Sequence, residues 1–403
     1  MIKKSDLKKL LAIAACFALS VGALETRDAA RAQSLEQSLA IQTSEQADDP
    51  SVELFPPVSL GFIGKYEVLE IASYHFKHDN PSRHPVVTAV ALSKDGSKVY
   101  VGGDDQRVYV SDPSEPKPKS SNFPENGVVA KPTKMFAEDW IRSIEFRPIP
   151  ENANEMEITT LAQSGEIAVW NLAQERKSLT APNAITGARM MDYSPNGNIL
   201  AVCGYEPVVK LFESSTLKTP VVWTAPGASS GALQFSNGGT LLALGGRNGV
   251  ARVWDTKQGR VKFDFVLTNI GDQQSRRIRA LSFYPLRYED SRDDKRTPEL
   301  LAVAGDADQI VVWDLQSGAP VARSAIDSGK VYSLAFIDRN LIVYGTSLNQ
   351  LVFWNIDDDE KLVLTPHTGT VSTIKYVESR NEILTGSFDA TVKRFKLAPK
   401  GAN

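Results

Sequence analysis

The sequence predicts an all-β fold in which seven antiparallel sheets close into a ring. Seven short strand-like runs end in a similar way, and the aligned positions near their ends are residues 111, 170, 212, 254, 313, 354 and 395. The steps between these positions are 59, 42, 42, 59, 41 and 41 residues. Repeats of about 40 to 45 residues that contain several short strands are typical of β-propellers. We therefore expect a seven-bladed β-propeller of four-stranded antiparallel blades.

Two further strand signals recur inside the repeats. An apolar strand ends in a turn, such as Tyr193-Ser194-Pro195-Asn196-Gly197, and a second strand with small residues follows, such as residues 241–246. Asp-Gly and Asn-Gly pairs supply the positive φ angles of tight turns, and glycine late in the second strand lets neighbouring backbones approach near the ring axis. Strand, turn, strand, turn and strand make an antiparallel meander, which is the expected unit of a blade.

The repeats resemble those of the WD-repeat family over about residues 65–397. Literal Trp-Asp pairs end two of them, at 254–255 and 313–314. The last repeat stops at Leu397 without an outer strand, whereas an additional strand-like run at 66–71 precedes the first repeat. In this family N-terminal chain completes the last blade, so the resemblance implies that residues 66–71 pair with the strand around 391–397. Such closure removes open sheet edges.

The resemblance also implies two structural histidine–aspartate pairs. Residues 367–371, His-Thr-Gly-Thr-Val, are similar to the segment that opens a blade in the family, and Asp389 lies where the family places an aspartate that bonds this histidine. In the first repeat His84 and Asp105 occupy the matching places. An imidazole held by a carboxylate stabilises a loop, so we expect a structural role for His367 and His84 and no catalysis from either.

The start of each first strand supplies a candidate binding site. Alignment of these strands puts seven residues at equivalent positions near one mouth of the central channel, namely Thr88, Arg142, Arg189, Gly231, Arg279, Tyr332 and Ser372. Guanidinium groups clustered there favour carboxylate or phosphate ligands. Family members commonly bind peptides at this mouth, which implies a protein or peptide partner, and the arginines suggest an acidic one. Three residues in turns between second and third strands would widen the site, namely Tyr205, Arg247 and Phe388.

Two alternatives for the binding surface stay open. Strict strand alternation would place the arginines beside Ile144, Met191 and Leu281, so that their stems pack between blades and their heads pair locally. Insertions at 113–127, 148–155 and 284–298 would emerge on the opposite face and are a second candidate for a docking rim.

Enzymatic and metal chemistry find little support. The chain has four histidines and lacks G-x-S-x-G, P-loop and H-E-x-x-H motifs. The one histidine cluster, His75 and His78 with Asp79 and His84, falls at an expected strand end and loop, so we expect no metal, no cofactor and no enzyme. The alternative is a small-ligand-binding, sugar-binding or hydrolytic propeller with its site in the central channel. Acidic residues at the mouth would favour it, and arginines stand there instead.

The N-terminal residues predict export. Lysines at 3, 4, 8 and 9 precede an apolar stretch from Leu10 to about Leu24, which is the layout of a signal peptide, and Ala30-Arg31-Ala32 fits a cleavage site. We expect a signal peptide at 1–32, a polar linker at 33–64 and the propeller at 65–403, in the periplasm or outside the cell. An uncleaved N-terminal anchor and a lipid anchor at Cys16 are the alternatives.

The composition of the exported chain limits its partners. Loss of residues 1–32 would move the formal net charge from −3 to −6, which disfavours nonspecific binding to nucleic acid. No membrane span is expected in the mature chain. Cys203 would then be the sole cysteine, so no intramolecular disulfide is expected. The sequence does not define the oligomeric state.

Overall fold

The computed structural model describes residues 57–76, 85–111, 127–148, 157–218, 220–272, 274–284, 299–327 and 329–401. These residues belong to one compact unit, Glu53–Asn403. The predicted signal peptide, most of the predicted linker, Cys16, His78 and His84 lie outside the described residues. In the part of the chain that is described, no helix is long and apolar enough to cross a membrane.

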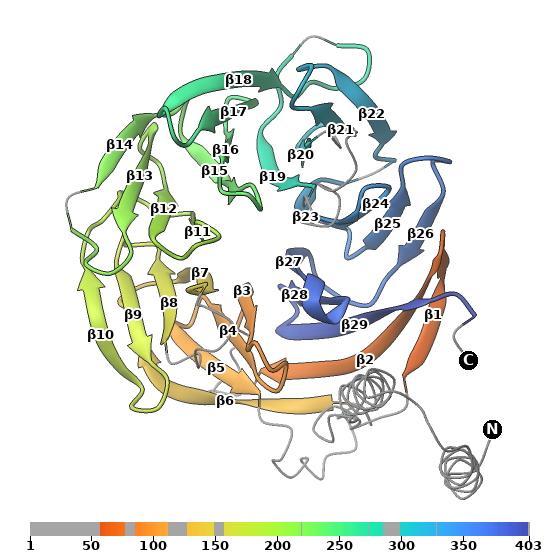
Figure 1. The fold of residues 1–403 in the computed structure, drawn as a ribbon. Coiled ribbons are helices and arrows are strands. Elements are labelled where there is room, and N and C mark those ends of the chain that lie inside the picture. The colour runs from red at the N-terminus through yellow and green to blue at the C-terminus, as the bar shows by residue number, and fades with distance from the viewer. Residues whose placement is uncertain are drawn as a thin grey trace, which may run out of the picture. The chain divides into compact units, whose positions relative to one another are not determined.

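Five of the sheets formed by the described residues contain four antiparallel strands each, as Figure 1 shows. The first contains β7 (Ile141–Phe146), β8 (Glu157–Ala162), β9 (Ile167–Asn171) and β10 (Arg176–Ala181). The second contains β11 (Met190–Tyr193), β12 (Ile199–Cys203), β13 (Val208–Glu213) and β14 (Val221–Thr224). The third contains β15 (Ser229–Phe235), β16 (Leu241–Gly246), β17 (Val250–Asp255) and β18 (Arg260–Val266).

The remaining two four-stranded sheets follow in chain order. One contains β19 (Ile278–Phe283), β20 (Leu300–Gly305), β21 (Gln309–Asp314) and β22 (Pro320–Ala325). The other contains β23 (Val331–Asp338), β24 (Leu341–Thr346), β25 (Leu351–Asn355) and β26 (Lys361–Leu364). Within the described residues the sixth sheet has nine strands and joins the first repeat to the last one.

The nine-stranded sheet begins with the last repeat, β27 (Val371–Val377), β28 (Glu382–Ser387) and β29 (Thr391–Pro399), with a short 3-10 turn at Glu378–Arg380. It continues through β2 (Tyr66–Phe76) to the first repeat, in the order β6 (Gly127–Phe136), β5 (Arg107–Ser111), β4 (Val99–Gly103) and β3 (Val87–Leu92). Strand β1 (Val58–Ile63) pairs with β2. The two repeats therefore share one sheet.

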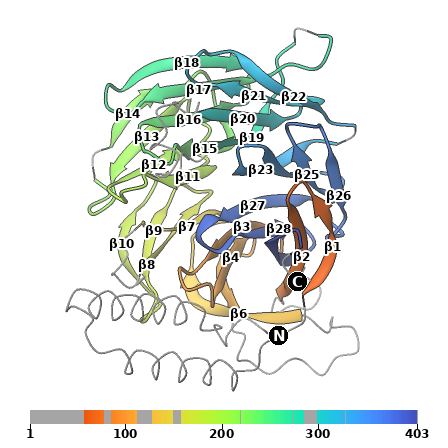
Figure 2. The same ribbon diagram turned by 45° about the vertical axis from the view of Figure 1, so that its right-hand side comes forward.

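The innermost strands of the sheets surround a common centre, seen face-on in Figure 1 and obliquely in Figure 2. These strands are β3, β7, β11, β15, β19, β23 and β27, and each contacts the next in this order. Strand β27 also contacts β3, so the ring of inner strands is closed. The all-β architecture is consistent with the predicted β-propeller.

The core lies between neighbouring sheets. Seven clusters of buried apolar side chains occur in the described residues, and each draws its members from two adjacent sheets or repeats. The seven positions that the sequence aligned are all buried in these interfaces or beside them, with 0 to 6% of each side chain exposed, namely Ser111, Trp170, Phe212, Trp254, Trp313, Trp354 and Phe395. This uniform burial confirms the alignment of the repeats.

Glycine late in the second strand has the predicted packing role. A Cβ atom on Gly245 in β16 would lie 2.4 Å from Cγ2 of Ile278, which belongs to the inner strand of the next sheet. A Cβ atom on Gly386 in β28 would lie 2.6 Å from Cγ1 of Val87 in β3. Adjacent sheets approach so closely near the axis that no side chain fits at these points.

Strand β2 closes the ring. It runs antiparallel to β29, with Val68 opposite Leu397 and His75 opposite Thr391, which confirms the pairing predicted for residues 66–71. The strand continues further than expected, and its second half runs parallel to β6, from Ser73 opposite Gly127 to Phe76 opposite Ala130. One N-terminal strand therefore covers the edge of the last repeat and holds the outer strand of the first repeat.

A second difference from the sequence expectation is β1. Residues 58–63 lie within the segment expected to be a polar linker, yet they form a strand antiparallel to β2, with Ile63 opposite Tyr66. Ile63 is buried in an apolar cluster with Val343 and Phe353 of the neighbouring sheet. This segment, Val-Ser-Leu-Gly-Phe-Ile, contains four apolar residues that indicate a strand, but the glycine among them weakens the strand pattern.

A buried ion pair reinforces the junction. Arg394 in β29 and Glu382 in β28 have 3% and 2% of their surfaces exposed, and Arg394 Nε donates to Glu382 Oε2 at 2.6 Å. Arg394 Nη1 also donates to the carbonyl of Gly96 at 2.9 Å, in the turn between β3 and β4. The last repeat is thus tied to the first repeat by a charge-assisted bond in addition to the strand pairing.

Truncation tests this closure. A chain that begins at residue 57 is the reference, one that begins at 65 lacks β1, and one that begins at 77 also lacks β2. Loss of β1 should lower the midpoint of denaturant unfolding without causing aggregation, because β2 still covers β29. Loss of β2 should cause aggregation, because it exposes the edge of β29. Light scattering and urea unfolding measure both effects, and equal stability of all three chains would contradict the topology.

Candidate functional site

Six of the seven inner strands start with a β-bulge, and it decides where Arg142 and Arg279 point. In β7 the pairing with β8 slips between Ile141 and Ser143, so Arg142 is an extra residue in the strand. Corresponding slips occur at the starts of β3, β15, β19, β23 and β27. Because a bulge interrupts alternation, successive residues such as Arg142 and Ser143 both face the channel. The alternation that would have turned the arginines between the blades does not hold at this point.

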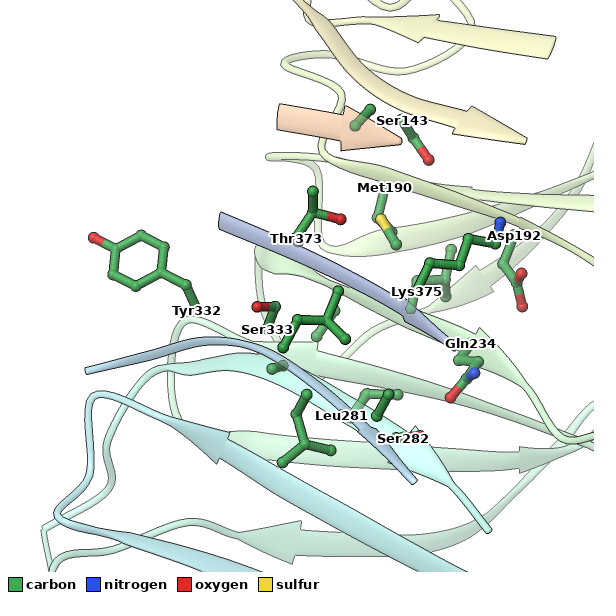
Figure 3. Close-up of a pocket in the computed structure, with 18 of the residues that line it drawn as sticks. Ser143, Met190, Asp192, Gln234, Leu281, Ser282, Tyr332, Ser333, Thr373 and Lys375 are labelled. Atoms are coloured by element: carbon green, nitrogen blue, oxygen red, sulfur yellow. The ribbon is translucent and has the colours of Figure 1, made fainter. Parts of the chain in front are cut away.

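One cavity of about 410 Å³ occupies the centre of the ring. Its lining includes all seven residues that the sequence placed at the channel mouth, namely Thr88, Arg142, Arg189, Gly231, Arg279, Tyr332 and Ser372. Figure 3 shows Tyr332 at one end of the cavity and polar side chains further along it. The structure therefore brings together residues that are up to 284 positions apart in the chain, from Thr88 to Ser372.

Arg279 is neutralised within the protein. Its Nε donates to Asp306 Oδ1 at 2.5 Å, in the turn between β20 and β21. Its guanidinium group also lies 4.6 Å from the centre of the Tyr332 ring, a cation–π distance. Arg277 is 3.9 Å from the same aspartate. The local pairing that the sequence left open thus applies to Arg279.

Arg142 and Arg189 form a less neutralised part of the mouth. Arg189 donates to the hydroxyl of Tyr205, and its guanidinium lies 4.6 Å from that ring, while Arg247 lies 5.6 Å from the ring. The Nε of Arg142 is buried and has no hydrogen-bond partner among the described residues. Burial and the nearby charge of Arg189 lower the pKa of Arg142 to about 10, so Arg142 remains a cation at neutral pH. A buried donor of this kind favours an anionic ligand.

Exposed apolar side chains surround the mouth. Tyr205 and Phe388 are 44% and 40% exposed, and the Phe388 ring packs edge-on against Tyr332 at 6.3 Å between centroids. Trp140, in the loop before β7, and Leu348, in the turn between β24 and β25, are 41% and 49% exposed. Sequence reasoning missed these two, because a pattern of apolar residues in a loop does not show which ones are covered. Exposed aromatic residues around arginines are the composition of protein-binding hot spots.

These side chains share one face of the ring. Strands of a meander alternate in direction, so the loop that enters each first strand and the turn between second and third strands lie at the same end. Trp140 belongs to the first kind of connection, and Tyr205, Arg247, Leu348 and Phe388 belong to the second kind. We call this surface the mouth face. The insertions that the sequence places on the opposite face lie largely outside the described residues.

The predicted structural pair in the last repeat is present. His367 is buried, with Nδ1 3.3 Å from Asp389 Oδ2 and 2.8 Å from Thr391 Oγ1, and Nε2 2.7 Å from Thr385 Oγ1. Burial alone would raise the pKa of Asp389, but the bonds and charge of His367 hold that pKa well below its usual range. In the first repeat Asp105 accepts a hydrogen bond from Tyr109, and its predicted partner His84 is outside the described residues.

A polar layer lies deeper in the cavity, and sequence reasoning missed it. Glu145, Asp192, Gln234, Ser282 and Lys375 line the same cavity from five different inner strands (Figure 3). Lys375 Nζ donates to Glu145 Oε2, and the backbone N–H of Phe235 donates to Asp192 Oδ2 at 2.6 Å. Burial, with a smaller contribution from the charge of Glu145, raises the pKa of Asp192 to about 8. Acidic groups are therefore present in the channel, one level below the arginines.

The described residues contain no group of three or more His, Cys, Asp and Glu side chains arranged to hold a metal ion. Cys203 is buried in β12, where its thiol lies 3.6 Å from the carbonyl of Met190.

Comparison with known proteins points to the family suggested by the repeats. Residues 75–112 and 359–396 match the family model described as WD domain, G-beta repeat. Over 289 residues the chain is 25% identical to the WD repeat-containing protein 91 homolog of Dictyostelium discoideum, an alignment that covers 68% of this chain and 35% of that protein. These matches support a place for the chain in the WD-repeat family.

Two further relatives are regulatory proteins by name. Over 184 residues the chain is 28% identical to Transcription factor unc-37 of Caenorhabditis elegans, covering 45% of this chain and 29% of that protein. Over 217 residues it is 24% identical to Cell division cycle 20.1, cofactor of APC complex, of Arabidopsis thaliana, covering 52% and 44%. The chain thus spans less than half of the length of each of these relatives.

Replacement of Asp192 tests the environment of the polar layer. A carboxyl group with a pKa near 4 in the unfolded chain and about 8 in the folded one is protonated only in the folded state between these values. The free energy of unfolding therefore falls as pH rises from about 4 to about 8. Asp192→Asn should remove this loss and be more stable at pH 8 by about 1 to 3 kcal/mol, because water in the cavity limits the effect.

Urea unfolding of both chains across this pH range measures the difference. Asp358→Asn, which removes a carboxylate from the exposed turn between β25 and β26, should not reproduce the gain. If the two curves for wild type and Asp192→Asn stay parallel from pH 4 to pH 8, the described environment of Asp192 is wrong.

Proposed function

We propose that this chain is a seven-bladed WD-repeat propeller that acts as a non-catalytic scaffold and binds a protein or peptide partner at the mouth face. WD-repeat proteins are generally interaction scaffolds, and the relatives support this class. The seven mutually contacting inner strands and the seven buried aligned positions support the blade count. The observation that carries the proposal is the set of exposed side chains on the mouth face, Trp140, Tyr205, Leu348 and Phe388, at the same end of the channel as Arg142 and Arg189.

An acidic segment is the partner chemistry that fits this face best. Arg142 presents a buried donor without a partner in the described residues, and the charge of Arg189 acts on it. A carboxylate would satisfy that donor and relieve the repulsion between the two guanidinium groups. The exposed aromatic rings would cover apolar residues that flank the carboxylate. The local positive charge opposes the formal net charge of −3 and would orient the partner toward the mouth.

Export remains part of the proposal on sequence grounds alone. The lysine-rich start and the apolar stretch from Leu10 to about Leu24 support it. Cell fractionation with sequencing of the mature N-terminus checks it, and recovery of the full-length chain in the cytoplasm would contradict it.

Variants at the mouth face separate binding from stability. The partner is first captured from the native cells by crosslinking, identified and purified, and its affinity for each variant is then measured by titration. Arg142→Ala should weaken binding about tenfold or more, which corresponds to about 1 to 3 kcal/mol, and leave the melting temperature unchanged, because its Nε bonds nothing in the described residues. Trp140→Ala should weaken binding to a similar extent.

For Arg279→Ala we expect the opposite pattern, a loss of stability rather than of binding. It leaves Asp306 without its closest cation, so it should lower the melting temperature more than it lowers affinity. Arg176→Ala, on the exposed outer strand β10, is the matched control and should change neither quantity. A set of mouth variants that lose stability but bind the partner normally would end the proposal.

A further inference from the structure

The central cavity has two levels of opposite charge. Arg142 and Arg189 line it at the mouth, and Glu145 and Asp192 line it deeper in the channel. Arg142 and Glu145 lie three residues apart in β7, and Arg189, which immediately precedes β11, lies three residues before Asp192 in that strand. At roughly 3.3 Å per residue in a strand, with the extra bulge residue adding little length in β7, the two levels are about 7 to 10 Å apart.

The deeper level has fewer positive groups than negative ones. Glu145 already pairs with Lys375, which reaches across from β27. Asp192 accepts backbone hydrogen bonds from Phe235 in β15 and from Tyr193, and the cation that acts on it among the described residues is Lys375. Two carboxyl groups and one ammonium group leave one negative charge without a counterion. Protonation of Asp192 removes this charge, in agreement with its raised pKa.

The mouth, in contrast, has positive groups that lack a negative partner. The buried Nε of Arg142 lacks an acceptor, and Arg142 and Arg189 repel one another. An anion alone would be held at the mouth and leave the deeper carboxyl unmatched. A cation alone would be repelled by the arginines on entry. A molecule that carries both charges can pair its anionic group with the arginines and its cationic group with the deeper carboxyl group.

We propose that the cavity binds a small extended zwitterion, with its carboxylate at Arg142 and its ammonium group at Asp192. The cavity volume of about 410 Å³ lies in the range of small-molecule sites, which is about 300 to 1,000 Å³. Ser143, Met190, Ser333 and Thr373 line the walls between the two levels, and Figure 3 shows these side chains around the cavity. Short polar and thioether side chains leave room for a methylene chain. This site shares Arg142 with the surface proposed for a protein partner, but its other end, at Asp192, lies deeper in the channel.

Calorimetric titration with ε-aminocaproate tests the site, because this molecule separates a carboxylate from an ammonium group by a methylene chain. Caproate lacks the ammonium group, hexylamine lacks the carboxylate, and glycine has both charges too close together. We expect ε-aminocaproate to bind at least tenfold more tightly than each of the other three. Equal affinity for ε-aminocaproate and hexylamine, or no binding of ε-aminocaproate at millimolar concentration, would overturn the proposal.

The pH dependence gives a second readout. The ammonium group replaces the proton of Asp192, which is released to solvent, so affinity should rise as pH rises from about 6 to about 8 and then level off. The charged groups that face Asp192 are Glu145 from β7 and Lys375 from β27. Titration in buffers of different ionisation enthalpy should show this proton release on binding. An affinity independent of pH would contradict placement of the ammonium group at Asp192.

Two variants locate the ends of the ligand. Asp192→Asn preserves the shape of the side chain and should lower the affinity for ε-aminocaproate at least tenfold and abolish proton release. Arg142→Ala should lower the affinity for ε-aminocaproate and leave the weak affinity for hexylamine unreduced. Arg176→Ala is the control for loss of one positive charge. Thermal melting of each variant confirms folding, and retained binding by a folded Asp192→Asn chain would overturn the proposal.

Discussion

The pairing of β2 with both β29 and β6 is the constraint on which the rest of the molecule depends. It converts a row of sheets into a closed ring, because a strand from the start of the described chain covers the edge of the last repeat. The buried Arg394 and Glu382 hold the same junction and connect it to the turn at Gly96. Closure brings β27 against β3, so residues from both ends of the described region face one cavity. A site assembled from all inner strands exists only because those two strands meet.

Within the closed ring, the β-bulge at the start of the inner strands determines what the cavity contains. It turns Arg142 and Ser143 toward the channel together, and the strand then resumes its alternation, so that Glu145 faces the same way. In β19 the bulge likewise directs Arg279 and Ala280 into the channel, and the alternation that follows directs Ser282 the same way. In β7 the bulge thus lets one strand contribute an arginine to the upper level of the cavity and a carboxyl group to the lower level.

The sequence was sufficient for the features that repetition encodes. The spacing of the repeats located the buried positions such as Trp254, and alignment of the first strands placed Arg142, Arg189 and Arg279 at one cavity. It was insufficient where geometry departs from regular alternation. Glu145 was missed because the bulge in β7 shifts which residues face inward, and the parallel pairing of β2 with β6 carries no local sequence signal. Arg279 is paired with Asp306, whereas the Nε of Arg142 has no partner among the described residues. Alignment of the strands does not reveal which arginine has such a neighbour.

Hydrogen–deuterium exchange of the intact chain, with and without its purified partner, tests the assignment of the mouth face most directly. The account predicts slower exchange in the connections of that face, namely the loop before β7, the turn between β12 and β13 and the turn between β28 and β29. Exchange in the turns of the opposite face, such as that between β3 and β4, should not change. Slower exchange confined to the opposite face would contradict the central claim, because the partner would then bind away from Arg142, Tyr205 and Phe388.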